Sequence, residues 1–168
     1  MNNKDSKYWI EKLQLQRHPE GGYFKEIYRS YEIIKKESLP ERYSDERNFS
    51  TSIYFLLEKN DVSLFHRLKS DEIWHFYSGT SLTLYIIDKN GFLKKIVVGD
   101  NPDNGEVLQT VIKNGNWFAA KVNNPDSYSL IGCTVSPGFS FNDFELAKRE
   151  DLIKLFPDHS DIIKMFTK

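Results

Sequence analysis

Two residues near the middle of the chain, His66 and Glu72, could perform acid–base or metal chemistry. An imidazole titrates near neutral pH and can act as a general base, and a carboxylate can orient its ring or stabilise its cation. Histidine and glutamate side chains are also common ligands of divalent metals. The pair therefore predicts a catalytic site built on His66 and Glu72, or a buried hydrogen-bonded pair that only stabilises the turn between them.

The segments around this pair decide where the two side chains point. Val62–Leu68 and Glu72–Tyr77 are rich in β-branched and aromatic residues and are expected to be strands joined by a short turn. Successive side chains of a strand alternate between its two faces. If His66 and Glu72 point into the protein, the following residues point inward with them and form a ligand-binding wall: Leu68, Trp74 and Phe76. His75 then faces the opposite side of the sheet, where a subunit interface is the expected environment.

Short strands separated by turn signals are predicted along most of the remaining chain. They are Tyr23–Ser30, Phe49–Leu57, Ser81–Asp88, Phe92–Val98, Val107–Ile112, Trp117–Val122, Ser127–Val135 and Phe139–Phe144. Asn90-Gly91 predicts a type I′ hairpin turn, which requires positive φ at both residues. The polar stretch from Tyr31 to Arg47 is expected to be a long loop at the rim of the sheet.

Helical patterns are confined to the two ends of the chain. Asp5 or Ser6 is expected to cap a short helix that runs towards Leu15. After Phe144 the pattern predicts a helix that contains Leu146 and ends before Pro157, then a last turn capped by Ser160 or Asp161. Many short antiparallel strands with short N- and C-terminal helices indicate an all-β fold, and a jelly-roll barrel leaves few exposed sheet edges.

Composition and charge limit the classes of function. At 168 residues the chain is expected to form one domain over 1–168. A formal net charge of −1, without a basic stripe, gives no reason to expect nucleic-acid or membrane binding. The single cysteine, Cys133, fits a reducing compartment and is expected to fill apolar space in the core. The polar N-terminus, Met1 to Lys7, has no apolar run typical of a signal peptide, so a cytoplasmic location is predicted.

A series of motifs in order along the chain resembles a known family. The motifs are His18-Pro19-Glu20-Gly21-Gly22, Thr51 to Leu57, Ser63 to Arg67, Asp71 to Tyr77, Trp117 to Ala120 and Gly132 to Gly138. Together they resemble the single-domain cupin-like family of unknown function, the fifth cupin family. The resemblance implies a double-stranded β-helix barrel, a homodimer and a pocket inside the barrel. In shape such proteins are similar to the epimerases of dTDP-4-keto-6-deoxyhexoses, in which the histidine corresponding to His66 is the base.

The metal-binding pattern of cupins is incomplete in this chain. Of the four ligands that the family pattern supplies, His66 and Glu72 remain, while Leu68 and Phe118 stand where histidines would be. A tight first-row metal site normally needs three or more protein ligands. The sequence therefore predicts no tightly bound cofactor, and any divalent metal would be held weakly by His66 and Glu72. Phe118 is instead expected to line an apolar pocket.

Two further groups of residues are candidates for ligand contacts. In His18-Pro19-Glu20-Gly21-Gly22, Glu20 and the glycine N–H groups could close the pocket mouth, although a rigid turn before the first strand explains the motif equally well. Arg29 could bind an anionic ligand, because a guanidinium recognises carboxylates and phosphates.

The sequence leaves three hypotheses of function. The leading one is a cupin that binds a small organic ligand inside the barrel and carries out metal-free epimerase- or isomerase-type proton transfer on a sugar-like or carbonyl substrate, with His66 as base. The second is a metal-dependent cupin enzyme, such as a dioxygenase or isomerase, with additional ligands such as Glu20 or His18. The third is a non-catalytic module that binds and senses a metabolite or serves as an interaction partner.

Overall fold

The computed structural model describes residues 4–168, so Met1–Asn3, the start of the polar N-terminal stretch, lie outside the described residues. Three α-helices lie at the ends of the chain: α1 Ser6–Leu13, α2 Arg149–Leu155 and α3 Ser160–Met165. The strands are β1 Gln16–Arg17, β2 Tyr23–Arg29, β3 Ile33–Ile34, β4 Arg47–Asn48, β5 Thr51–Glu58, β6 Val62–Leu68, β7 Asp71–Gly79, β8 Leu82–Ile87, β9 Leu93–Val98, β10 Gln109–Ile112, β11 Trp117–Val122, β12 Tyr128–Ser136 and β13 Phe144–Leu146. Short 3₁₀ turns occupy Lys36–Ser38, Pro102–Asn104, Phe141–Asp143 and Pro157–His159.

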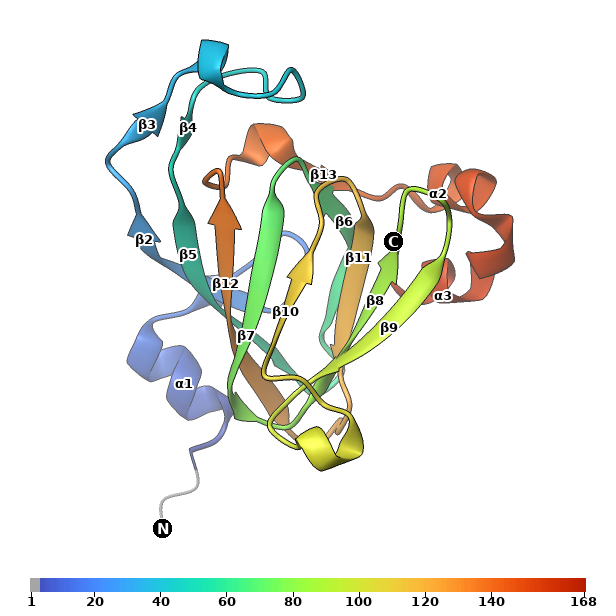
Figure 1. Cartoon of the computed structure of the whole chain (residues 1–168). Helices are drawn as coiled ribbons and strands as arrows, with labels where there is room; N and C mark the ends of the chain where they lie inside the picture. The colour runs from blue at the N-terminus through green and yellow to red at the C-terminus, as the bar shows by residue number, and fades with distance from the viewer. Residues whose placement is uncertain (1–3) are drawn as a thin grey trace.

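Two antiparallel sheets form the body of the molecule (Figure 1). One sheet has the strand order β1-β2-β5-β12-β7-β10, and the other has the order β13-β6-β11-β8-β9. Strands that are distant in sequence, such as β5 and β12, lie side by side, as a jelly roll requires. The all-β jelly-roll prediction is therefore confirmed.

The inward faces of the two sheets enclose the main hydrophobic core. Its fully buried members come from both sheets and include Phe55, Trp74, Leu84, Phe118 and Ile131. A second buried cluster lies where α2 and α3 cover the outside of β6, β8 and β11, with Phe65 and Phe166 at its centre. A third lies beneath α1. Burial of apolar side chains in these clusters is the main source of stability that the fold offers.

Several predicted elements differ from the structure. The first helix begins as expected, because the Asp5 carboxylate accepts a hydrogen bond from the Tyr8 N–H. The strand predicted over Phe139–Phe144 is wrong: Ser140 caps the 3₁₀ turn Phe141–Asp143, and pairing begins only at Phe144. Leu146 consequently lies in β13 and not in a helix.

Two predictions of local turn chemistry are also wrong. Only Gly91 of the pair Asn90-Gly91 has positive φ, so the turn is not of type I′. The chain instead forms a longer loop, in which the Asp88 carboxylate accepts hydrogen bonds from the N–H groups of Asn90 and Phe92. Neither Ser160 nor Asp161 caps α3, because His159 precedes the helix without a side-chain hydrogen bond and the preceding 3₁₀ turn leads directly into it.

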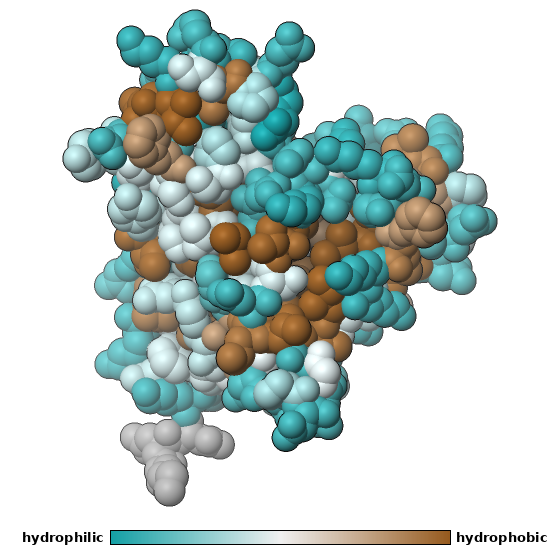
Figure 2. All heavy atoms as spheres, viewed as in Figure 1, coloured by the Kyte–Doolittle hydropathy of each residue, from teal (hydrophilic) through white to brown (hydrophobic). Residues whose placement is uncertain are grey.

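The stretch from Tyr31 to Arg47 forms an arm at the rim of the barrel, as expected, with β3 and β4 paired at its base. The arm stands above the rest of the sheet in Figure 1, and hydrophobic residues gather on it in Figure 2. Tyr43 is fully buried and its hydroxyl lies 2.9 Å from the Ser70 hydroxyl, which ties the arm to the turn between β6 and β7. Within residues 4–168 no helix is long and apolar enough to cross a membrane.

Candidate functional site

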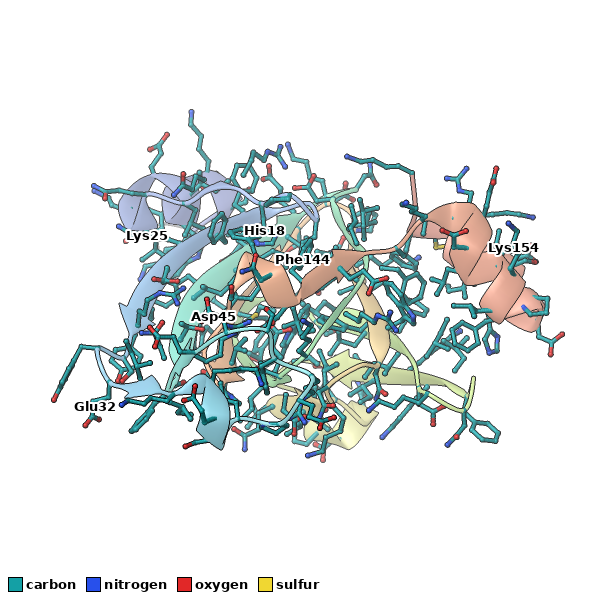
Figure 3. All side chains as sticks on the ribbon, turned by 90° about the horizontal axis from the view of Figure 1, so that it is seen from above. His18, Lys25, Glu32, Asp45, Phe144 and Lys154 are labelled. Carbon is teal, nitrogen blue, oxygen red and sulfur yellow. The ribbon has the colours of Figure 1, made fainter. Side chains whose placement is uncertain are left out.

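A cavity of about 430 Å³ opens at the arm end of the barrel. Seen from above in Figure 3, His18 and Phe144 lie close together at this end, and their ring centroids are 6.2 Å apart. The lining combines titratable side chains with an apolar wall: His18, Glu20, Glu26, Arg29, Glu46, Arg47, His66, Glu72 and Cys133, and Phe24, Ile53, Leu68, Val135, Phe139, Phe141 and Phe144. A cavity of this size matches pockets for small organic molecules.

The turn before β2 inserts Glu20 into the barrel. Gly21 and Gly22 have φ values of +114° and +69°, which other residues rarely adopt. A Cβ on Gly21 would lie 2.0 Å from the Val62 carbonyl oxygen, so only glycine allows this close approach to β6. The Leu64 N–H donates to the Glu20 carbonyl, and the Glu20 residue is 6% exposed. The motif is therefore both a rigid turn and the device that places Glu20 in the cavity wall.

An irregularity in β6 brings two further side chains to Glu20. His66 is paired with Phe118, but Ser63 is paired with Ala120, so β6 carries one extra residue between these pairs. A bulge of this kind changes the alternation of side chains. Ser63 Oγ donates to Oε1 of Glu20 at 3.0 Å, and Nε2 of His66 lies 3.0 Å from Oε2. Strict alternation would have placed Ser63 and His66 on opposite faces.

The hydrogen bonds of His66 fix its tautomer. Nδ1 lies 2.7 Å from the Leu64 carbonyl oxygen, which can only accept, so Nδ1 carries a proton. Burial lowers the pKa of His66 to about 3, and burial together with the charge of Glu72 raises the pKa of Glu20 well above its usual value. Both causes favour the neutral forms, in which the Glu20 carboxylic acid donates to Nε2 of a neutral His66.

His18 lies on the other side of the Glu20 carboxyl group. Its Nδ1 accepts from the Glu20 backbone N–H at 3.3 Å and lies 3.5 Å from Oε2 of the same residue. The ring packs edge-on against Phe24, with centroids 4.6 Å apart, and burial lowers the His18 pKa to about 4. His18 is thus a neutral, buried neighbour of the Glu20–His66 pair.

Glu72 does not pair with His66, contrary to the expectation that it would orient the imidazole or stabilise its cation; Glu20 occupies that position. Oε2 of Glu72 is buried and has no hydrogen-bond partner among residues 4–168. Burial raises the pKa of Glu72 to about 7, and the nearby Trp74 and Cys133 side chains lower this pKa by a smaller amount. The Trp74 indole N–H is nevertheless not in hydrogen-bonding geometry with any described group. Cys133 is buried as expected, but it also lines the cavity beside Glu72.

The arginines of the cavity are held by acidic partners. Arg29 makes two hydrogen bonds to Glu26, at 2.7 and 3.0 Å, and donates also to the Asn48 side chain and the Phe139 carbonyl. Arg47 is buried and makes two hydrogen bonds of 2.6 Å to Asp143. Arg29 does line the cavity, but its donors already bind protein groups, which argues against the predicted role in anion binding.

Three of the predicted ligand-binding residues lie behind the cavity wall. Leu68 lines the cavity, whereas Trp74, Phe76 and Phe118 are outside its lining. Trp74 and Phe118 are fully buried and pack against each other with centroids 6.2 Å apart, because they belong to the main hydrophobic core between the sheets. Phe118 supports the site indirectly, since its ring centroid lies 4.0 Å from that of His66.

The residues of the site do not form a metal-binding group. Among the residues that the structure describes, no three His, Cys, Asp or Glu side chains are arranged to hold a metal ion. His18 and Glu20, the extra ligands considered for a metal-dependent cupin, do reach the cavity beside His66, but Nδ1 of both histidines is engaged with the backbone and Glu20 faces Nε2 of His66. The donor set therefore does not fit the metal that the fold family commonly carries.

Some site residues were not recognised from the sequence. Ser63 gave no signal, because only the bulge turns it towards Glu20. Arg47 and Asp143 are far apart in sequence and meet only through the arm and the 3₁₀ turn. For Phe139, Phe141 and Phe144 the sequence predicts a regular strand, whereas their rings pack against one another in the cavity lining.

Comparisons with known proteins agree with the fold. A family model described as Cupin superfamily (DUF985) matches residues 7–147. An uncharacterised protein of Saccharomyces cerevisiae is 33% identical over 154 residues, covering 86% of this chain and 76% of that protein. Crystallised relatives include a protein from Shewanella oneidensis, with a TM-score of 0.89, 37% identity and coverage of 99% of both chains. A hypothetical protein from Leishmania major has a TM-score of 0.87, 35% identity and coverage of 97% and 98%.

A more distant similarity concerns the fold alone. Oxalate decarboxylase from Bacillus subtilis superposes with a TM-score of 0.54 at 17% identity, over 89% of this chain but 36% of that enzyme. Such a match shows a shared barrel, and a barrel supports many chemistries.

Proposed function

Because the chain belongs to the family described as Cupin superfamily (DUF985), we propose that it binds a small organic ligand inside its barrel and moves a proton on that ligand without a metal. The observation that carries this proposal is the 3.0 Å contact between Oε2 of Glu20 and Nε2 of His66 in the wall of the cavity. A buried acid that faces a buried base at this distance can donate one proton and accept another.

The cavity supports the binding part of the proposal. Its volume suits a molecule of monosaccharide size, and apolar side chains such as Phe24, Ile53 and Val135 form much of its wall. The acid–base pair is 6% exposed at Glu20 and 2% at His66, so a bound ligand would react with little competing water.

The hydrogen bonds suggest how the pair would act. When a ligand carbonyl oxygen replaces Nε2 of His66 as acceptor, Glu20 donates its proton to that oxygen. Nε2 is then free to accept a proton from the neighbouring carbon, and the ligand becomes an enol. The imidazolium that forms keeps its Nδ1–H bond to Leu64 and lies beside the new Glu20 carboxylate, so the charges that develop are paired. Return of the proton from His66 to the carbon, with return of the hydroxyl proton to Glu20, regenerates the carbonyl compound. An epimer forms when the enol presents its other face to His66 before the proton returns.

A two-part experiment tests the proposal. Metabolites are first screened for those that raise the melting temperature of the native protein. The increase that each one causes is then measured for Ile53→Trp, in which the larger side chain fills the cavity, and for the matched control Ile33→Trp on the exposed arm. Binding is expected to be lost only in Ile53→Trp. Each bound metabolite is then incubated with protein in D₂O and followed by NMR. Deuterium incorporation that needs Glu20 and His66 supports proton transfer, and tight binding without incorporation would leave a non-catalytic metabolite-binding module.

We also propose that the chain forms a homodimer through the outer face of the larger sheet. On this face Ile73 and His75 of β7 pair with Val111 and Gln109 of β10, and Tyr77 packs over Gly132. Val111 is 43% exposed and Tyr77 50% exposed, and a symmetric pair of sheets would cover them. Light scattering coupled to size exclusion should give twice the chain mass for the native protein, and a reduced mass for Val111→Glu.

A further inference from the structure

We propose that the ligand carries a cationic amine, which binds the carboxylate of Glu72 in the cavity. The inference rests on the proposed function, because it names the chemical class of the molecule that the barrel would bind. Four observations support it: the balance of charges along the cavity, the engagement of both arginines, the Glu72 oxygen without a partner among the described residues, and the phenylalanines of the cavity lining.

The cavity has more acidic than basic side chains. Among the described residues, Glu20, Glu26, Glu46 and Glu72 line it, while its Lys and Arg residues are Arg29 and Arg47 only. Both histidines of the wall are buried and hydrogen-bonded in ways that suit their neutral forms. Glu20 is held in its neutral form, so the attraction for a cation and the repulsion of an anion come from the other carboxyl groups of the lining.

Neither arginine is available to reverse that balance. Arg29 is held by Glu26, and Arg47 is held by Asp143, which itself lies outside the cavity lining. The other three glutamates of the lining, Glu20, Glu46 and Glu72, form no ion pair with a Lys or Arg within residues 4–168. A phosphate or carboxylate on the ligand would meet no free cation there, and would have to displace a protein carboxylate to bind.

Glu72 is the carboxyl group best placed to bind a donor. Its residue is 7% exposed, it lines the cavity, and Oε2 lacks a partner among the described residues. Glu20 is already bonded to Ser63 and His66, and Glu46 is exposed to solvent. A buried acceptor without a partner costs free energy that a donating ligand group recovers, and an ammonium group recovers most because its hydrogen bonds to a carboxylate are charge-assisted.

The aromatic wall suits the same ligand. Phe24, Phe139, Phe141 and Phe144 line the cavity, and the last three pack edge-to-face around its opening with centroids 5.0 to 6.4 Å apart. Phenylalanine rings present a negative face that attracts a cation and an apolar surface that accepts its hydrocarbon part. A neutral alcohol of equal size would gain only the second of these interactions.

Three probes with one carbon frame test the inference: benzylamine, benzyl alcohol and benzoate. Their binding to the full chain is measured by calorimetry and ligand-observed NMR at pH 8. We expect benzylamine to bind at least tenfold more tightly than benzyl alcohol, and benzoate to bind more weakly than either. Glu72→Gln keeps the shape of the side chain and should abolish the preference for the amine. Glu46→Gln, which removes an equal charge at the exposed mouth, should change it less than twofold.

The outcomes separate this inference from the proposed function. Equal binding of alcohol and amine, tighter binding of benzoate, or an amine preference that survives in Glu72→Gln would each overturn the assignment of Glu72, while a small-molecule cavity would stand. Failure of all three probes, together with failure of the metabolite screen against the Ile53→Trp variant, would remove both proposals. If Glu46→Gln weakens amine binding as much as Glu72→Gln does, the preference is a general effect of negative charge. That result would also overturn a specific contact with Glu72.

Discussion

Oε2 of Glu20 lies 3.0 Å from Nε2 of His66, and the proton on Nδ1 of the same imidazole is fixed by the Leu64 carbonyl group. The acid and the base of the site are therefore partners of each other until a ligand separates them. Glu20 comes from a glycine-rich turn and His66 from a bulged strand, so two local irregularities of the barrel create the contact.

Glu20→Gln should preserve the fold and abolish proton transfer. The glutamine oxygen can accept from Ser63 and its amide N–H can donate to Nε2 of His66, so the free energy of unfolding should change by less than about 1 kcal/mol. Glu20→Ala leaves both partners buried and unbonded, at a cost of about 1–3 kcal/mol for each group. Urea unfolding distinguishes the two variants, and a glutamine variant as unstable as the alanine variant would contradict the assigned hydrogen bonds.

Glu72→Gln should become more stable than the native protein as the pH rises. Burial raises the pKa of Glu72 from 4.5 to about 7, so the folded state binds the proton more tightly than the unfolded state. The resulting stability is complete below pH 4.5 and is lost as the pH rises through about 7, and a shift of this size corresponds to roughly 3 kcal/mol. The difference in unfolding free energy between variant and native protein should therefore increase by up to that amount between pH 4.5 and 8.

The unfolding free energy of Glu72→Gln must be compared with that of the native protein at each pH, because two histidines change the stability of both proteins with pH in the direction opposite to Glu72. Burial lowers the pKa of His18 to about 4 and that of His66 to about 3, so their contribution to stability is lost as the pH falls below 6.5. Both contributions are present in Glu72→Gln and cancel in the comparison. A difference in unfolding free energy between Glu72→Gln and the native protein that stays constant from pH 4.5 to 8 would show that Glu72 keeps its ordinary pKa.

The sequence predicted the strands and their facing better than it predicted the site. Alternation of side chains placed His66, Leu68, Glu72 and Trp74 inside the barrel, and the structure buries all four. The same rule failed at Ser63, because a bulge depends on pairing with β11, which is distant in sequence. It also failed at Phe141, because Ser140 caps a 3₁₀ turn there, and Asp143 at the end of that turn binds the distant Arg47. The motif that contains Glu20 and two glycines indicated a role for Glu20 at the pocket mouth, but its contact with His66 could not be predicted.

The Arg47–Asp143 ion pair should couple the arm to the aromatic residues over the cavity. Both side chains are buried, so Arg47→Met leaves a charged Asp143 with Lys69, at 3.6 Å, as its remaining basic partner. Breaking a buried pair typically costs about 3–5 kcal/mol, whereas replacing both partners by apolar residues costs less. Unfolding of Arg47→Met, Asp143→Leu and the double variant should give a double variant less destabilised than the sum of the single variants. Additive effects would mean that the two residues contribute independently.

Protein purified without chelator should contain less than one equivalent of any transition metal, and added Mn²⁺ or Zn²⁺ should leave its melting temperature unchanged. The reason is that no three ligands are arranged for a metal within residues 4–168, and a group that binds only the folded state would raise its stability. Elemental analysis and a thermal melt provide the two measurements. A stoichiometric metal that is lost on His66→Ala would replace proton transfer with a metal-dependent reaction.

Gly21→Ala should disrupt the site more than any other glycine substitution of comparable φ. A Cβ there would lie 2.0 Å from the Val62 carbonyl oxygen, so the turn must move away from β6 and take Glu20 with it. Gly105 is the matched control, since its φ of +76° is also left-handed but, apart from its chain neighbours, no atom of residues 4–168 lies within 4 Å of the added carbon. Gly105→Ala should therefore cost only the backbone strain, about 1 kcal/mol, while Gly21→Ala should cost several kcal/mol and abolish deuterium incorporation. Equal destabilisation of the two variants, with the exchange reaction intact in both, would mean that the turn does not position Glu20 for catalysis.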